Sequence, residues 1–260
     1  MSTRAEQYVA TVLRREQITE HLVRIVLGGE HLAGFTSTGI PDEWVGLIVP
    51  GQFQSRYYTV RSWDGSELVL DIVVHDVGLV TEWARGECVG DEVTITEAKG
   101  SYRLPDDAEW IYLVGDLTAL PAMARIAREN QQVPLHAWAE VPDDLGDYFG
   151  DDLPADDVTW VGSPEEGSGL AGLVEGLTFP ESPGYFWMAG ESAQMRAIRK
   201  HLMREVKLPS THYDVMGYWR GVARRQPRAV DPGPIYRAGK AAGKSDEEIW
   251  ADYDAAREAE

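Results

Sequence analysis

The chain of 260 residues contains a single cysteine, Cys88. One thiol cannot form an internal disulfide, a cysteine-rich zinc site or a cysteine-ligated iron–sulfur cluster. The six histidines show neither the His-x-His nor the His-Glu-x-x-His spacing of common metal sites. We therefore expect no permanent metal centre. If the protein is a redox enzyme, an organic cofactor must carry the electrons.

Positive charge is also scarce, because 24 Lys and Arg residues face 43 Asp and Glu residues and give a net charge of −19. A field of this sign repels nucleic acid and anionic lipid, so we expect no nucleic-acid partner. No apolar run approaches the roughly 18 residues of a membrane-spanning helix, which predicts no membrane insertion. The first residues lack the apolar core of a secretory signal, so we expect a cytoplasmic location.

The length and the ordinary globular composition predict one large or two modest domains. Residues 1–104 show short alternating segments separated by Gly, Pro and Asp clusters, which is typical of a β-barrel or sandwich. The expected strands are Tyr8–Arg15, Leu22–Leu27, Phe53–Arg61, Leu68–His75 and Glu92–Thr96.

Residues 105–225 alternate between apolar strands and helices, which favours an α/β domain with a parallel sheet. The acidic stretch Leu104–Glu109 is the expected boundary between the two domains. The expected strands are Ile111–Val114, Leu135–Val141, Val158–Val161 and Tyr185–Ala189, and the expected helices are Ala119–Arg128, Gly169–Leu177 and Ser192–Lys207.

Residues 226–260 read as a basic loop followed by a last helix. Ser245 and Glu248 have the spacing of a capping box at a helix start. Ile249, Trp250 and Tyr253 then fall on one face, so we expect this helix to dock on the protein.

The run Arg56-Tyr57-Tyr58-Thr59-Val60-Arg61 places a guanidinium, aromatic rings and a hydroxyl on one strand. An aromatic ring can stack on a flat cofactor while an arginine pairs with its phosphate. The same residues are also common in an ordinary strand, so this pattern alone leaves both interpretations open.

Two further polar patterns follow in the first domain. Asp71, Val73 and His75 share one face of an expected strand. The segment from Gly78 to Ala84 reads as a turn entering a helix, whose free N–H groups favour a pyrophosphate. An ordinary strand and an ordinary connection remain the alternatives.

The second domain has two glycine turns that follow strands. Gly115–Ala122 reads Gly-Asp-Leu-Thr-Ala-Leu-Pro-Ala, and Met188–Met195 begins Met-Ala-Gly-Glu. Neither matches the Gly-x-Gly-x-x-Gly dinucleotide fingerprint, so each is a weak nucleotide signal by itself.

Taken together and in this order, these motifs resemble the siderophore-interacting protein family, over about Tyr8 to Gly221. The resemblance implies an α+β two-domain fold, in which an antiparallel six-stranded flavin-binding β-barrel precedes an α/β nicotinamide-nucleotide domain and a C-terminal helix. It implies FAD as cofactor and NADPH or NADH as electron source. Ala189 stands where related reductases often have Cys, so no catalytic thiol is implied.

The resemblance also assigns residues to the cofactors. Arg56, Tyr58 and Thr59 would hold the isoalloxazine and the flavin phosphate, and Val80 and Thr81 the pyrophosphate. The full set of expected cofactor-binding residues is Arg56, Tyr58, Thr59, Val60, Asp71, Val73, His75, Val80, Thr81, Trp83, Asp116, Thr118, Ala119, Gly190 and Glu191.

The implied activity is the reduction of a ferric siderophore, which releases ferrous iron. The acidic strand ends at Glu140–Asp144 and Gly162–Glu166 favour NADH locally, whereas the family includes NADPH users. A ferredoxin is an alternative electron donor. A general flavoenzyme of the same superfamily and a non-catalytic siderophore-binding protein are the competing interpretations.

Many ferric siderophores are anionic, so positive side chains are expected beside the flavin despite the overall negative charge. Lys99, Arg125 and Arg220 are the candidate substrate-binding residues. For each of them, a solvated surface charge is the alternative interpretation.

Overall fold

The computed structural model describes residues 6–52, 54–75, 78–142, 145–220 and 244. Contacts divide the chain into two units, Met1–Trp219 and Arg220–Glu260. All helices and strands of the described residues belong to the first unit. The helix expected after Ser245 lies outside the described residues. None of the described helices is long and apolar enough to cross a membrane.

Six antiparallel strands form a closed barrel in the order β1-β2-β5-β4-β3-β6, as the resemblance implies. Strand β1 pairs with both β2 and β6, which closes the sheet on itself. The strands are β1 (Gln7–Thr19), β2 (Leu22–Gly28), β3 (Trp44–Ile48), β4 (Arg56–Trp63), β5 (Leu68–Val73) and β6 (Glu92–Thr96).

Alternation of side chains fills the barrel interior. Leu70, Ile72 and Val74 are fully buried in the barrel core, as their shared face predicts. Asp71 lies between them in sequence and faces outward to Tyr148 of the second domain. The outer face of β5 therefore borders the α/β domain. Two short helices complete this half, η1 (Glu30–Leu32) and α1 (Leu79–Arg85).

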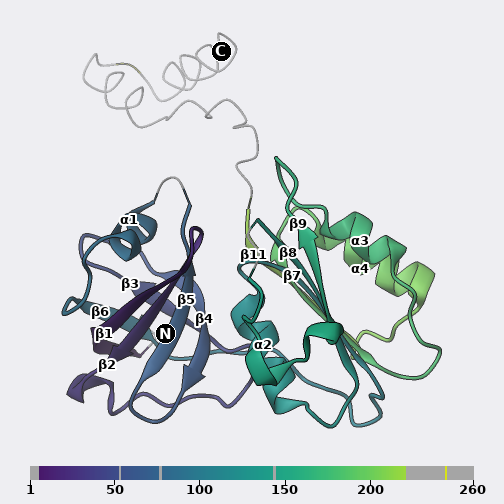
Figure 1. Ribbon diagram of the computed structural model, residues 1–260, viewed down its shortest axis with the longest axis horizontal. Helices are drawn as coiled ribbons and strands as arrows, with labels where there is room; N and C mark the ends of the chain where they lie inside the picture. Colours follow the sequence, from purple (N-terminus) through teal and green to yellow (C-terminus); the bar gives the residue numbers. More distant parts are fainter. Residues whose placement is uncertain (1–5, 53, 76–77, 143–144, 221–243, 245–260) are drawn as a thin grey trace. The chain divides into compact units, whose positions relative to one another are not determined.

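The second domain is a five-stranded parallel sheet in the order β11-β10-β7-β8-β9 (Figure 1). Chain order reverses between β7 and β10, which makes their carboxyl ends a topological switch point. The strands are β7 (Ile111–Asp116), β8 (Leu135–Val141), β9 (Val158–Gly162), β10 (Tyr185–Glu191) and β11 (Tyr213–Trp219).

Helices cover both faces of this sheet. Helix α2 (Leu120–Glu129) packs on one face and contacts β4 of the barrel. Helices α3 (Leu170–Gly176) and α4 (Met195–His201) pack on the other face. The expected helix Ser192–Lys207 begins later than predicted, at Met195, and its last turn is the π-helix η4 (Leu202–Val206). Two 3₁₀ turns, η2 (Gly150–Asp152) and η3 (Ala155–Asp157), connect β8 to β9.

Asp42 is a fully buried carboxylate that joins the barrel to the rest of the chain. It accepts hydrogen bonds from the backbone N–H groups of Ser101 and Tyr102 at 2.8 and 2.9 Å. The indole Nε1 of Trp187 in β10 lies 3.3 Å from its Oδ2. These donors come from the interdomain linker and from the α/β domain, so Asp42 ties three parts of the fold together.

Glu43 forms the second buried connection. Its carboxylate accepts hydrogen bonds from Ser37 and Thr38 and pairs with Arg125 of α2 at 2.9 Å. Burial alone would raise the pKa of Glu43, but these hydrogen bonds and the Arg125 charge outweigh it and lower the pKa. Arg125 also donates to the carbonyl oxygen of Val60 at 2.9 Å. Helix α2 is thus fixed to the barrel wall.

We expect Glu43→Ala to lower the free energy of unfolding by about 3–5 kcal/mol, because buried Arg125 keeps only the exposed Glu129 carboxylate, 3.7 Å away, as a charge partner. Urea denaturation at pH 7 measures this loss. The double variant Glu43→Ala/Arg125→Met should lose less than Glu43→Ala alone, since no unpaired charge remains. The control is Glu67→Ala in the exposed Arg14–Glu67 pair, worth about 0–1 kcal/mol. A Glu43→Ala loss as small as the control would contradict the structural role.

Candidate functional site

The expected nucleotide-domain residues lie side by side at the carboxyl ends of the paired strands β7 and β10. Asp116 ends β7, and Gly190 and Glu191 end β10. In open α/β sheets, ligands bind outside the carboxyl ends of the strands at the switch point. The candidate site therefore begins at this edge of the sheet.

Asp116 organises this edge. Its Oδ1 accepts hydrogen bonds from the N–H and the hydroxyl of Thr118, and its Oδ2 accepts one from the indole of Trp219 at 2.5 Å. Burial raises the pKa of Asp116 despite these bonds. Ala119 is fully buried behind it, with its N–H bonded to the Asp116 carbonyl oxygen.

The bond between Asp116 and Trp219 crosses β10, which lies between β7 and β11. Gly190 leaves room for it, because a Cβ at this position would meet Asp116 Oδ2 at 2.7 Å. A side chain here would push the carboxylate away from the indole. The glycine of the Ala-Gly-Glu turn is therefore required by packing.

The same edge is strongly acidic. Glu140, near the end of β8, is buried and accepts a hydrogen bond from the Gly169 N–H at 2.6 Å. Burial raises the pKa of Glu140, and the nearby charges of Asp116 and Glu191 raise it further. A negative field at this edge opposes an additional phosphate on a bound nucleotide.

On the barrel side, β4 presents three expected flavin residues. Arg56 is exposed, Tyr58 is half-buried and Thr59 is buried. Burial raises the pKa of Tyr58 to about 12, although the charge of Arg56 opposes the shift. Strand β4 thus has an exposed guanidinium at its first residue and a buried hydroxyl where it meets the α/β domain.

Thr59 meets the α/β domain at Tyr218 of β11. The hydroxyl of Tyr218 is buried and has no hydrogen-bond partner among the described residues. Burial raises the pKa of Tyr218, while the neighbouring Thr59 side chain lowers it in part. The two expected halves of the site, β4 and the carboxyl end of the sheet, therefore converge at these two hydroxyls.

Val60 does not fit the expected role of a cofactor contact. Its side chain is fully buried in the barrel core. Its N–H donates to the carbonyl oxygen of Glu43, and its own carbonyl oxygen accepts from Arg125. Alternation along β4 turns this side chain inward, so Val60 belongs to the barrel core and the domain junction.

Asp71 also occupies a different place from the one expected. The exposed fraction of its side chain is 0%, because Arg24 pairs with both carboxylate oxygens and the hydroxyl of Tyr148 donates to Oδ2 at 2.6 Å. No side-chain surface remains for a ligand. Asp71 thus holds the connection between β8 and β9, which bears Tyr148, against the barrel. Val73, on the same face of β5, is half-buried against the α/β core.

The residues around α1 lie at one rim of the barrel. His75 is exposed, and its N–H donates to the hydroxyl of Thr81 at 3.2 Å. Val80 packs in the barrel core, and the indole of Trp83 donates to Asp91 at 2.9 Å. His75 and Thr81 are therefore together, whereas Val80 offers only its backbone to a ligand.

The three expected substrate cations do not behave alike. The exposed fraction of the Lys99 side chain is 60%, and its Nζ lies 3.4 Å from Oε1 of Glu97. Arg220 is exposed after the end of β11. Arg125 is buried and paired with Glu43, so its guanidinium is engaged within the protein and does not have the exposure expected of a substrate-binding residue. Its helix packs on the barrel, which the sequence pattern does not reveal.

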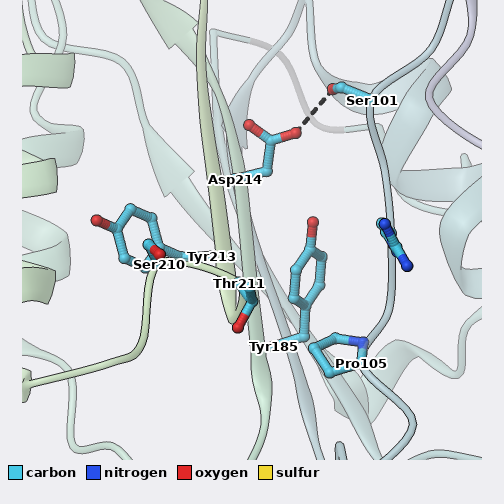
Figure 2. A pocket seen from close by; sticks show the side chains of 8 residues that line it. Ser101, Pro105, Tyr185, Ser210, Thr211, Tyr213 and Asp214 are labelled. Atoms are coloured by element: carbon cyan, nitrogen blue, oxygen red, sulfur yellow. Dashed lines mark hydrogen bonds between the residues drawn. The ribbon is translucent and has the colours of Figure 1, made fainter.

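A cavity of about 400 Å³ lies at the amino ends of β10 and β11, away from this edge. Figure 2 shows its lining and the hydrogen bond from Ser101 to Asp214. The lining residues are Ser101, Arg103, Pro105, Tyr185, Ser210, Thr211, Tyr213 and Asp214. Among the described residues, no cluster of His, Cys, Asp or Glu is arranged to hold a metal ion.

Two site residues were not predicted from the sequence, Tyr218 and Trp219. They end β11, a strand that the alternation pattern missed because Gly217 and Asp214 interrupt its apolar run. The signal that could have identified them is an aromatic pair directly before the basic stretch that begins at Arg220.

Comparison with known proteins agrees with this architecture. The chain is 26% identical over 234 residues to the NADPH-dependent ferric-chelate reductase of Escherichia coli, covering 80% of this chain and 91% of that protein. It is 26% identical over 255 residues to the ferric vibriobactin reductase ViuB of Vibrio cholerae, covering 85% and 93%. The crystal structure of a siderophore utilization protein from T. fusca superposes with a TM-score of 0.73 at 26% identity, covering 85% of this chain and 95% of that one.

Family models match both halves of the fold. The siderophore-interacting FAD-binding domain matches residues 11–56 and 51–102, which hold the barrel. The siderophore-interacting protein model matches residues 108–221, which hold the parallel sheet. The chain therefore belongs to the siderophore-interacting protein family.

Proposed function

We propose that this protein is an FAD-dependent oxidoreductase that reduces ferric siderophores and releases ferrous iron, with NADPH or NADH as electron source. The proposal rests on one observation. Strand β4, which lies in the part of the chain that matches the FAD-binding domain, meets the carboxyl edge of the parallel sheet. Two relatives of similar length are named as ferric-chelate and ferric vibriobactin reductases.

The residues at this junction fit a flavin. Arg56 is exposed and forms no ion pair with a described residue, so its guanidinium is available to a phosphate. Thr59 and Tyr218 hold hydroxyl groups at the meeting point of the two halves. Gly78 has a φ of 139°, and among the described residues a Cβ there would meet only the Thr81 hydroxyl, at 3.9 Å. The turn therefore lets a ligand approach the backbone beside α1.

In this proposal Arg56 holds the flavin phosphate, Tyr58 and Thr59 hold the isoalloxazine, and His75 and Thr81 border the pyrophosphate. FAD, when bound, accepts a hydride from a nicotinamide and passes single electrons to ferric iron. In the part of the chain that the structure describes, no cluster of His, Cys, Asp or Glu is arranged to hold the iron. It places the chelate close to the flavin, and iron leaves because oxygen-rich siderophores hold Fe²⁺ more weakly than Fe³⁺.

The nicotinamide coenzyme would bind at the carboxyl edge of the sheet. Asp116, Thr118 and Gly190 form its expected border, and Trp219 is held beside them by Asp116. The acidic field of Glu140 and Glu191 favours NADH over a coenzyme with a 2′-phosphate. One relative is named as NADPH-dependent, so both coenzymes belong in the test.

Lys99 and Arg220 remain the candidate cations for an anionic chelate, since both are exposed. A ferredoxin is the alternative electron donor, although the charge of −19 makes an acidic ferredoxin a poor docking partner. We place the activity in the cytoplasm, because the nicotinamide coenzymes that would drive it are cytoplasmic metabolites.

The proposal is tested under anaerobic conditions with the FAD-loaded full chain. NADPH or NADH should bleach the flavin absorbance near 450 nm, and a ferric siderophore should restore it while a ferrous-specific chelator traps the iron. Bleaching without reoxidation by ferric chelates would instead indicate a general flavoenzyme. FAD that neither coenzyme reduces would indicate a siderophore-binding protein without turnover.

We expect Arg56→Ala to raise the dissociation constant for FAD by one to two orders of magnitude, because a charge-assisted phosphate contact of roughly 1.5–3 kcal/mol is lost. Fluorescence titration of the apoprotein with FAD measures this change. Arg56→Lys keeps the charge and should recover part of the affinity. Equal affinity of Arg56→Ala and the parent protein would remove Arg56 from the site.

We expect Gly190→Ala to slow reduction of the bound flavin by nicotinamide coenzyme, because the new Cβ displaces Asp116 from Trp219. Stopped-flow absorbance at saturating FAD measures how the rate of flavin reduction depends on coenzyme concentration. The coenzyme concentration that gives half the maximal rate should rise about tenfold or more. The control is Gly162→Ala at the end of β9, where a Cβ would meet no atom of a described residue within 4 Å. Identical kinetics for both variants would rule out this part of the site.

A further inference from the structure

Tyr218 is the phenol at the domain junction whose hydroxyl lacks a partner. Its Oη is buried and has no hydrogen-bond partner among the described residues. Its ring lies edge-on to that of Trp187, with 6.4 Å between the ring centroids. Leaving a buried hydroxyl unbonded costs about 1–3 kcal/mol. The arrangement therefore suggests an acceptor that the protein chain does not supply.

Neighbouring carboxylates do not accept from Tyr218, since its hydroxyl has no hydrogen-bond partner among the described residues, and the hydrogen bonds that these carboxylates accept come from other donors. Asp116 accepts from Thr118 and Trp219. Asp42 accepts from the linker and from the Trp187 indole. Burial, and then the charges of Asp42, Asp214 and Asp116, raise the pKa of Tyr218. The phenol therefore stays protonated, and it can act as a donor.

The barrel residue beside this phenol is Thr59, which is itself buried. The two side chains come from different domains and lie close enough for Thr59 to lower the pKa of Tyr218, yet the Tyr218 hydroxyl forms no hydrogen bond with a described residue. Strand β4, which carries Thr59, lies in the part of the chain that matches the FAD-binding domain. A group with hydrogen-bond acceptors along its edge, held between the domains, would satisfy the Tyr218 donor.

We propose that Tyr218 donates a hydrogen bond from its hydroxyl to the isoalloxazine ring of bound FAD. It is the contribution of the α/β domain to orienting the flavin, opposite Thr59 of the barrel. This inference rests on the proposed function, because it requires that the chain binds FAD. It adds a residue from β11 to a flavin site otherwise assigned to the barrel.

A second buried phenol provides a matched control. Tyr102 Oη is also buried and has no hydrogen-bond partner in the described part of the chain. Its ring packs edge-on against Tyr185 in the α/β core, with centroids 5.2 Å apart. The groups that raise its pKa are its own burial, then Tyr185, Asp42 and Glu129, and Thr59 is not among them. Tyr102→Phe therefore removes an equivalent hydroxyl away from the junction with Thr59.

The experiment compares the full-length parent, Tyr218→Phe and Tyr102→Phe. The apoproteins are titrated with FAD, and the visible spectrum and midpoint potential of the bound flavin are then recorded. Tyr218→Phe should weaken FAD binding about tenfold and shift the flavin absorption maxima. If the substitution weakens the binding of reduced FAD more than that of oxidised FAD, the midpoint potential falls. The fall is about 30 mV for each tenfold difference between the two losses of affinity. Tyr102→Phe should leave all three quantities unchanged.

The outcomes separate the two proposals. If the parent binds FAD and Tyr218→Phe matches it in affinity and spectrum, the role of Tyr218 is overturned while the proposed function stands. Weaker FAD binding with an unchanged flavin spectrum would mark Tyr218 as merely structural and would also overturn it, as would equal effects of the two variants. A parent protein that binds no FAD contradicts the proposed function itself. Thermal melting of each apoprotein confirms that both variants fold.

Discussion

Two adjacent buried carboxylates, Asp42 and Glu43, hold the barrel and the parallel sheet in one arrangement. Both are fully buried, and each is satisfied by donors from outside the barrel, the linker and Trp187 for Asp42 and Arg125 for Glu43. A buried charge is tolerated only when it is paired and hydrogen-bonded, so these contacts specify one geometry strongly. A shift of either domain would leave a charge without its partner.

The candidate site depends on this constraint, because neither domain contains it alone. Thr59 comes from the barrel and Tyr218 from the sheet, and their hydroxyls approach one another only when the domains are fixed. The junction also explains why Arg125 and Asp71 are unavailable to ligands. The residues that bind the domains together have carboxylates and hydroxyls of the protein as their partners. The exposed Arg56 is left for a ligand.

The pattern of the sequence predicted most of the architecture. The short alternating segments of residues 1–104 predicted a barrel or sandwich, and the alternation of strands and helices after them predicted the parallel sheet. Strand β3 was missed because Val45-Gly46-Leu47 is not an alternating segment, and β11 because Gly217 breaks its pattern. Both missing strands need pairing partners far away in sequence to be identified.

The site itself was harder to predict, because tertiary packing decides which way a side chain faces and which group it pairs with. Local spacing cannot show that α2 packs on β4, so the pattern predicted Arg125 as a substrate-binding residue rather than as the buried partner of Glu43. Val60 was grouped with its neighbours in a motif, although alternation turns it into the barrel core. The motif residues Asp116 and Gly190 were found, but the reason for the glycine, its close approach to Asp116, required the structure.

Hydrogen–deuterium exchange of the full-length protein without FAD tests most directly whether the buried carboxylates hold the domains in place. The backbone N–H groups of Ser101 and Tyr102 donate to Asp42. They should exchange as slowly as those of the central strands β7 and β10, and adding FAD should change them little. Exchange of these two amides as fast as that of the exposed turn at Asp64–Ser66 would contradict the account, because the domains would then separate without breaking the fold.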